Sequence, residues 1–488
     1  MSVARHTVYN LAGAIVPLAV TIVTVPLYLH LIGPQRYGIL ALCWTLLGFM
    51  GFMNLGIGPA VAQKLAASRD GPAKRREDIF WSALLISLLA SAVAGTVGYI
   101  AAGHYFGSAA FRNFALGGEV RAALPWLTLV IPAAMVASVL GGALQGRFEF
   151  LKLNVINTSG SVLMALLPLI AAYALGPSLA LLIGAGLVAK LIECTLLFVA
   201  CSNTIPLTRP RAPKWRVVKE LFALGSWITI SAMLGPILEN SDRFVIGAFI
   251  GAEAVAAYVI TYNLVTRLTL IPSSLARALY PRFASTTADG GQLLEVTATR
   301  AVVAVMTPIA FLTLVALEPF LRLWLGTGIA TIAHPVGSIL VVGVWLNSVA
   351  QVPYVSLQGR ARADLPAKLH IAYLVPYFAV LYFAVSRFGL IGAALAWSFR
   401  SFWDPALFLM TGNMGRVLPF ILPSVLVVAA TAAITIGLDS RTAEYWLSLA
   451  VLGGIAIFLS ARVSPVPLSG AIPFIRQNLK LDPISLRR

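Results

Sequence analysis

Residues 8–30 read VYNLAGAIVPLAVTIVTVPLYLH and contain no Asp, Glu, Lys or Arg. Residues 418–438 read LPFILPSVLVVAATAAITIGL and have the same character near the other end of the chain. An α-helix needs about 20 apolar residues to cross the roughly 30 Å of hydrocarbon in a bilayer. Both stretches therefore predict membrane-spanning helices.

The composition agrees with a membrane protein. Hydrophobic residues make up 59% and charged residues 11% of the 488 residues, against roughly 45–50% and about 25% in soluble domains. The first apolar run is longer than the core of a cleavable signal peptide and contains Pro17 and Pro26, so we interpret it as a retained span. The fold class that follows is an all-α polytopic membrane protein.

Fourteen spans are expected from hydropathy and turn residues. They cover residues 8–31, 38–62, 80–103, 123–144, 153–175, 179–202, 221–249, 254–281, 301–324, 332–358, 366–385, 389–411, 418–438 and 446–462. The loops between them are short, and a soluble catalytic domain, which needs at least about 50 residues, has no room.

Positive charge is distributed unevenly between the two sides of the predicted membrane. A cytoplasmic N-terminus places 25 of the 35 Lys and Arg residues on the cytoplasmic side and 6 on the other. This bias predicts that both termini are cytoplasmic. Topology and attraction to anionic lipid explain the basic loops 64–76 and 209–219, so the net charge of +17 predicts no nucleic-acid partner.

Two pairs of opposite charges lie inside predicted spans. Lys190 and Glu193 are three residues apart, and Arg400 and Asp404 are four apart, so each pair shares one helical face. Ionisable groups at membrane depth are costly and usually face a cavity or a partner. Each pair is therefore either part of a site or a structural ion pair between helices.

Further ionisable groups lie in the seventh and eighth spans. Glu239, Asp242 and Arg243 lie toward the outer half of the seventh span and form either an interfacial anchor or a site. Arg267 lies near the middle of the eighth span with no carboxylate within one helical turn. An unpaired cation at this depth favours a water-filled cavity that receives an anion.

Several kinds of chemistry are excluded by missing motifs. The chain has no GxxxxGK[ST] phosphate loop and no HExxH spacing. Its cysteines, Cys43, Cys194 and Cys201, lie inside apolar stretches and form no disulfide or metal pattern. We expect no cofactor, no metal and no ATP hydrolysis. Any transport must therefore be driven by an ion gradient or by the difference in substrate concentration between the two sides of the membrane.

A family resemblance emerges from the order of short motifs along the chain. These are Asn10-Leu-Ala-Gly13, Pro26-Leu-Tyr28, Leu31-Ile-Gly33, Tyr37-Gly38, Asn54-Leu-Gly-Ile-Gly58, Ser241-Asp-Arg243, Gly247, Gly251, Tyr258, Leu279-Tyr-Pro-Arg282, Leu323-Trp-Leu-Gly326 and Gly389-Leu-Ile-Gly-Ala-Ala394. The chain resembles polysaccharide and O-antigen flippases of the multidrug/oligosaccharidyl-lipid/polysaccharide exporter superfamily, over nearly its whole length to about residue 411.

The resemblance implies two six-helix lobes related by a pseudo-twofold axis along the membrane normal, with two extra C-terminal helices. The lobes would be residues 1–202 and 221–411, joined by a cytoplasmic loop at 203–220 and followed by the extra spans and a cytoplasmic tail at 412–488. Leu31-Ile-Gly-Pro-Gln35 and Phe249-Ile-Gly-Ala-Glu253 occupy matching places in the two halves, as an internal repeat requires.

Two departures narrow the resemblance. Lipid II flippases of this superfamily are expected to carry cations on the first, second and eighth helices, and here only Arg267 on the eighth matches. Multidrug exporters of the superfamily typically carry an acid on the first helix, and this chain has none there. Both departures favour the polysaccharide branch.

The predicted function is therefore a flippase, not an enzyme, that moves a polyprenyl-diphosphate-linked oligosaccharide across a bacterial inner membrane by alternating access. The candidate substrate-binding residues are Arg267, Arg400, Lys190 and Arg243, and the candidate sites for coupling to Na⁺ or H⁺ are Asp242, Asp404 and Glu239. The resemblance also implies membrane lipid and proteins of polysaccharide assembly as partners. The alternatives are a cation-coupled multidrug exporter and an O-antigen polymerase or ligase, although the latter generally needs a larger outer loop.

Overall fold

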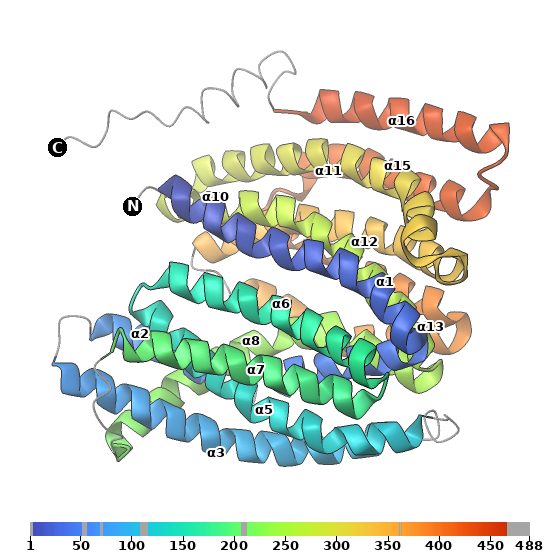
Figure 1. Ribbon diagram of the computed structural model, residues 1–488. Helices are drawn as coiled ribbons and strands as arrows, with labels where there is room; N and C mark the ends of the chain where they lie inside the picture. The colour runs from blue at the N-terminus through green and yellow to red at the C-terminus, as the bar shows by residue number, and fades with distance from the viewer. Residues whose placement is uncertain are drawn as a thin grey trace. The chain divides into compact units, whose positions relative to one another are not determined.

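The computed structural model of the chain is helical throughout the residues that it describes, which are 3–50, 56–68, 72–107, 116–205, 212–360, 362 and 364–465 (Figure 1). The all-α class predicted from composition is confirmed. Parts of the predicted inter-lobe loop, 206–211, and of the predicted tail, 466–488, lie outside the described residues.

The helices follow the predicted spans in order. They are α1 (Val3–Met50), α2 (Ile57–Ala67), α3 (Ala73–Phe106), α5 (Gly117–Gly146), α6 (Phe150–Leu175), α7 (Leu179–Ser202), α8 (Trp215–Phe249), α9 (Ala252–Val265), the 3₁₀ turn η2 (Thr266–Thr269), α10 (Leu270–Ser285), α11 (Ala288–Leu325), α12 (Thr327–Gly359), α13 (Asp364–Trp403), the 3₁₀ turn η3 (Asp404–Ala406), α14 (Leu407–Thr411), α15 (Met414–Gly437) and α16 (Ala443–Val463).

Among the described residues, 11 helices are long and apolar enough to cross a membrane. Two of these 11 run through two predicted spans without a loop: residues 16–49 cover parts of the first two predicted spans, and residues 364–411 contain the eleventh and twelfth. The predicted seventh span corresponds to α8, and the side chains of residues 224–234 in that helix lie outside the description. The fourteen predicted spans and the observed helices therefore agree.

Glycine makes the sharp turns inside the two continuous helices. Gly33 in α1 has φ 77° and Gly389 in α13 has φ 59°, and each separates two predicted spans. Backbone with positive φ costs other residues a steric clash at Cβ, whereas glycine adopts it freely. Gly33 lies in the predicted loop between the first two spans, whereas Gly389 is the first residue of the predicted span 389–411.

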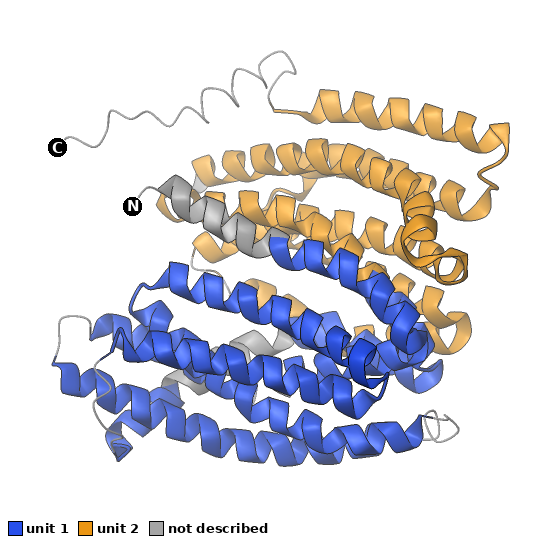
Figure 2. Cartoon of the chain, in the orientation of Figure 1, with its two compact units in different colours: residues 1–260 blue, residues 261–488 orange. Residues whose placement is uncertain are grey.

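The chain divides into two compact units, residues 1–260 and 261–488 (Figure 2). The predicted lobes, with their boundary at 203–220, stay a prediction. In unit 1, α5 packs on α2, α3 and α7, and α7 packs on α6 (Figure 1). In unit 2, α12 packs against α10, α11, α13 and α15, and α16 lies against α11 and α15.

Small residues allow α2 and α5 to approach closely in unit 1. A Cβ added at Gly142 would clash with the backbone oxygen of Gly58, and one added at Gly146 would lie 2.5 Å from the backbone oxygen of Ala62. Close helix contacts at glycine are the usual way in which membrane helices pack without a hydrophobic driving force. This crossing fixes the ends of α2 and α5 relative to each other.

The two halves of the chain repeat a local detail that supports an internal repeat. Leu144-Gln-Gly-Arg147 ends α5, and Leu357-Gln-Gly-Arg360 ends α12. Gly176 and Gly389, which both have positive φ, are separated by the same number of residues as Arg147 and Arg360. We refer to the two tetrapeptides as the first and second LQGR motifs.

Candidate functional site

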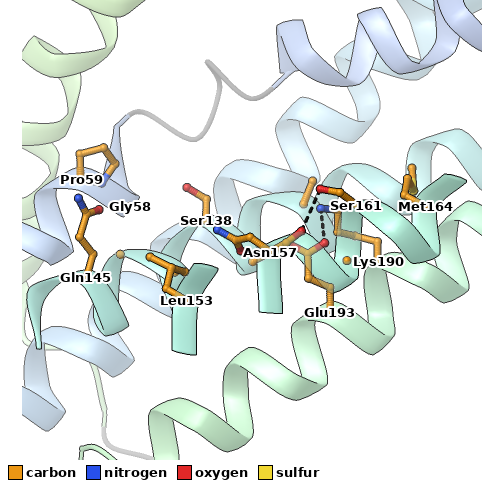
Figure 3. Close-up of a pocket in the computed structure, with 15 residues that line it drawn as sticks. Gly58, Pro59, Ser138, Gln145, Leu153, Asn157, Ser161, Met164, Lys190 and Glu193 are labelled. Carbon is orange, nitrogen blue, oxygen red and sulfur yellow. Dashed lines mark hydrogen bonds and ion pairs between the residues drawn. The ribbon is translucent and has the colours of Figure 1, made fainter. Parts of the chain in front are cut away.

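Unit 1 contains an open cavity of about 560 Å³ between α2, α5, α6 and α7 (Figure 3). Its lining mixes small apolar residues with hydroxyl, amide and charged side chains. The residues are Gly58, Pro59, Ala134, Ala137, Ser138, Gly141, Gly142, Gln145, Leu153, Asn157, Gly160, Ser161, Met164, Lys190 and Glu193. A polar cavity within apolar helices is the kind of place where a hydrophilic ligand can be held inside a membrane.

The local sequence of α5 explains why its side of the cavity is open. Ala134, Ser138, Gly142 and Gln145 follow helical spacing, so they lie on one face together with two further small residues. Because most side chains on this face are glycine, alanine or serine, little volume is filled between α5 and its neighbours. The amide of Gln145 lies at the end of this face.

The charged part of the cavity comes from α7. Lys190 Nζ donates to Glu193 Oε2 at 2.7 Å, and the two side chains are 23% and 11% exposed. A Cβ at Gly160 would lie 2.7 Å from the carboxyl carbon of Glu193, so this glycine makes room for the carboxylate. The predicted pairing of Lys190 with Glu193 is confirmed, and their place in the cavity leaves both the structural and the binding role open.

Figure 3 shows a hydroxyl and an amide side chain beside this pair, and further ones along the cavity. Asn157 and Ser161 come from α6, and Ser161 Oγ donates to the backbone oxygen of Asn157 at 2.9 Å. Ser138 and Gln145 come from α5. Such side chains both donate and accept hydrogen bonds, so the lining matches the hydroxyl groups of a carbohydrate.

The predicted residues Asp242 and Arg243 lie at an internal junction of unit 1. Asp242 is fully buried, and its carboxylate accepts from the Tyr258 hydroxyl and, at 2.8 Å, from the backbone N–H of Arg243. Arg243 Nη1 donates to Thr45 Oγ1 at 3.2 Å, which joins α8 to α1. Glu239, one turn earlier on α8, is exposed.

Arg267 lies on η2, where the eighth span changes from α to 3₁₀ geometry. Its side chain is exposed, and no hydrogen bond or ion pair joins it to another residue that the structure describes. A short 3₁₀ stretch inside a longer helix often marks a hinge or a functional position. The cation is therefore presented on a break in the helix and not on a regular face.

Arg400 and Asp404 are both buried inside unit 2, but their partners differ from the simple pair that their spacing predicts. Asp404 accepts from the Tyr373 hydroxyl at 3.0 Å and from Asn347 Nδ2 at 3.2 Å. The Arg400 guanidinium carbon lies 5.3 Å from the centre of the Trp397 ring. Because α13 ends at Trp403 and the 3₁₀ turn η3 begins at Asp404 and contains Pro405, the regular helical relation between positions 400 and 404 ends there.

Glu295 was not among the predicted site residues. It is fully buried on α11, and its carboxylate accepts from Ser356 Oγ at 2.6 Å, Thr411 Oγ1 at 2.5 Å and Asn413 Nδ2 at 3.0 Å. Arg360 of the second LQGR motif lies 3.7 Å from it. Hydropathy places Glu295 just before the ninth span, where an exposed residue is expected, and only the repeated motif could have drawn attention to it.

Comparison with known proteins agrees with the sequence analysis. The family model described as polysaccharide biosynthesis protein matches residues 30–332. The chain is 24% identical over 410 residues to a Shigella flexneri protein named "Putative O-antigen transporter", covering 83% of this chain and 97% of that one. It is 26% identical over 277 residues to the teichuronic acid biosynthesis protein TuaB of Bacillus subtilis (strain 168), covering 52% and 55%.

Solved structures agree on the fold. The lipid II flippase MurJ in an inward closed conformation superposes with a TM-score of 0.72 at 12% identity, covering 97% of this chain and 100% of that one. An inward-facing multidrug resistance transporter of the MATE family gives a TM-score of 0.65 at 16% identity, covering 83% and 98%. At these identities the likeness shows a common fold.

Proposed function

Because this chain belongs to the polysaccharide biosynthesis protein family of multi-pass membrane transporters, we propose that it flips a polyprenyl-diphosphate-linked oligosaccharide across the bacterial inner membrane. The chain is a transporter and not an enzyme. The lipid-linked substrate, the direction of movement and the alternating-access mechanism are the parts that need testing.

The polar cavity of unit 1 carries this proposal. Its hydroxyl and amide groups can replace the water that sugar hydroxyls lose on leaving the aqueous phase, and a carbohydrate left without such partners in hydrocarbon would be strongly unfavourable. The Lys190–Glu193 pair has no net charge and both donates and accepts hydrogen bonds, so it suits a neutral sugar. A purely apolar drug would gain little from this lining.

Arg267 is the proposed contact for the diphosphate. A planar guanidinium offers two parallel N–H groups to phosphate oxygens, which a lysine cannot do. We expect Arg267→Ala to abolish export while the protein still reaches the membrane, and Arg267→Lys to keep only part of the activity.

The test is accumulation of the lipid-linked oligosaccharide, identified by mass spectrometry, in a deletion strain complemented with each variant. Retention of single repeat units at the inner leaflet in the deletion strain supports a flippase. Single units reaching the outer leaflet would point to a polymerase instead. Normal export by well-expressed Arg267→Ala would remove this residue from the site.

Coupling to Na⁺ or H⁺ is proposed to involve the carboxylates Asp242, Asp404 and Glu239, because hard cations and protons both bind carboxylate oxygen. Asp242 and Asp404 already accept hydrogen bonds from their neighbours, so protonation would require these bonds to rearrange. If Asp242→Asn and Asp404→Asn both leave transport and its dependence on the ion gradient unchanged, this assignment is wrong.

The proposed orientation has both termini in the cytoplasm, from the unequal distribution of Lys and Arg. Reporter fusions after Lys219 and Arg488 should report a cytoplasmic location, and a fusion after Phe114 a periplasmic one. A periplasmic C-terminus would contradict this topology.

A further inference from the structure

The first LQGR motif ends in an arginine whose charge is not used by the protein around it. Two nitrogens of the Arg147 guanidinium, Nε and Nη1, are buried and have no hydrogen-bond partner. No ion pair joins this side chain to another residue that the structure describes. Buried N–H groups of native proteins nearly always have an acceptor, so such an arginine calls for one from outside the chain.

Two acids of unit 1, one close to Arg147 in sequence and one that meets the end of the neighbouring helix α2, pair with other cations. Glu149, two residues further on, lies 3.2 Å from Lys152. At the end of α2, against which α5 packs, Lys64 lies 2.8 Å from Glu220. The C-terminus of α5 favours a nearby cation through its dipole. That explains the sign of the charge at Arg147 but provides no acceptor for its buried N–H groups.

The turn after Arg147 is strained. Phe148 has φ 61°, a left-handed conformation that costs a bulky residue free energy, and its side chain is 52% exposed. It is the single non-glycine residue with positive φ among the described parts of the chain. Strain of this kind persists where the surroundings impose it and is concentrated at ligand sites. Here it ends α5 directly at Arg147.

The same position in unit 2 shows what a partner looks like. Nη2 of Arg360 in the second LQGR motif lies 3.7 Å from Oε2 of the fully buried Glu295, an ion pair at a distance at which this nitrogen makes no hydrogen bond. Glu77 and Glu295 are separated by the same number of residues as Gly33 and Gly251, the glycines of the proposed internal repeat. We therefore identify Glu77 as the counterpart of Glu295 in unit 1. Glu77 is buried too, but no ion pair joins it to Arg147. The arginine is present in both motifs, whereas an ion pair between it and this glutamate is present in the second.

We propose that Arg147 is an anion-binding residue at the C-terminal end of α5, and that it takes a phosphate group. The cavity lining extends along α5 as far as Gln145, two residues before Arg147, and Arg147 itself lies outside that lining. A guanidinium fork fits phosphate oxygens in a bidentate manner. The choice of phosphate rests on the proposed function, and its source is either the diphosphate of the transported lipid or the headgroup of an anionic phospholipid.

The test measures phosphate binding without any transport. The full chain is placed in nanodiscs of phosphatidylcholine, and its melting temperature is followed as inorganic pyrophosphate is added. Arg147→Gln should weaken the apparent affinity for pyrophosphate at least about tenfold, because it removes a charge-assisted hydrogen bond. Arg360→Gln is the matched control: it should lower the melting temperature yet leave the pyrophosphate affinity unchanged, because Glu295 already uses that arginine.

A second set of nanodiscs, with phosphatidylglycerol in place of phosphatidylcholine, separates the two sources. Stabilisation by pyrophosphate that requires Arg147 supports the diphosphate. Stabilisation by phosphatidylglycerol alone that requires Arg147 supports the phospholipid headgroup. If Arg147→Gln changes neither response, the inference is wrong. A wild-type protein that binds pyrophosphate but moves no lipid-linked sugar in vesicles would overturn the proposed function and leave this site standing.

Discussion

The two LQGR motifs have the same four residues at the end of a helix but different surroundings. Around the second, a buried carboxylate joins α11, α12, the end of α14 and the residue before α15, and it lies beside Arg360. Around the first, Arg147 has buried nitrogens and no acceptor among the described residues.

The difference teaches how a repeated fold separates stability from binding. An arginine that is ion-paired with a carboxylate of its own chain contributes to the structure, and its charge is already balanced. The same arginine without one keeps its hydrogen-bonding capacity for a molecule that comes and goes. In a protein built from repeats, an ion pair that is present in one copy and missing from the other therefore indicates where a ligand can bind.

The largest expected effect breaks the paired copy. Glu295→Ala removes the carboxylate beside Arg360 and takes away an acceptor from Ser356, Thr411 and Asn413. Removing one partner of a fully buried ion pair destabilises proteins by about 3–5 kcal/mol, and the partial exposure of Arg360 lowers the contribution of this pair below that range. We expect a large drop in melting temperature in detergent and little folded protein.

The control for this variant removes both charges. Glu295→Gln combined with Arg360→Gln should recover part of the lost stability, because an amide can still accept hydrogen bonds and no isolated charge remains. If Glu295→Ala melts like the wild type, the second motif is not held by this pair and the contrast with the first disappears.

A smaller effect tests what the two motifs share. Each contains a glycine in close contact with a neighbouring helix: a Cβ at Gly359 would lie 2.7 Å from Phe283 Cβ, and one at Gly146 2.5 Å from the Ala62 backbone oxygen. Overpacking of this kind costs about 1–3 kcal/mol. Gly359→Ala and Gly146→Ala should lower the melting temperature by similar amounts.

Gly454 on α16 provides a matched control, because a Cβ there meets no atom within 4 Å. Gly454→Ala should be neutral or slightly stabilising, since alanine is the better helix former. Unequal losses at Gly359 and Gly146 would mean that the two motifs are packed differently and are not copies of one structural element.

The smallest expected effect concerns the salt bridge between Lys64 and Glu220, close to the first LQGR motif. The hydrogen bond from Lys64 holds the pKa of the Glu220 carboxyl below its ordinary value of 4.5. The stability that this adds is present above the unfolded pKa and is lost as the pH falls through the lowered folded pKa. Lys64→Gln should therefore melt slightly below the wild type at pH 7, and the gap should close toward about pH 3. A gap that stays constant over this range would show that the pair contributes nothing.

The sequence predicts most of the fold and part of the site. Runs of apolar residues define the spans because length and composition alone decide membrane crossing, and Gly33 and Gly389 mark the turns because positive φ needs glycine. The spacing of Lys190 and Glu193 also predicts their contact, because neighbours on one helix meet without help from tertiary structure.

Features that depend on packing between helices could not be predicted in this way. The cavity exists because small residues of α5 face α2, α6 and α7, and no local pattern shows which helices will be neighbours. Asp404 accepts hydrogen bonds from Tyr373 and Asn347, which lie far away in sequence. Arg400 packs on the Trp397 ring and makes no ion pair within 4 Å with Asp404. Glu295 lies outside the predicted spans, so hydropathy gave it no weight.

The four residues of η2 give the eighth span a mechanical property. A 3₁₀ helix rises about 2.0 Å and turns about 120° per residue, whereas an α-helix rises about 1.5 Å and turns about 100°. If Thr266–Thr269 returned to α geometry, the helix would shorten by about 2 Å and α10 would rotate by about 80° about its own axis relative to the last turn of α9. Rotation and shortening of the span would then be coupled. The direction of the Arg267 guanidinium would change with the pitch of its own helix, while both flanking segments kept their hydrogen bonds.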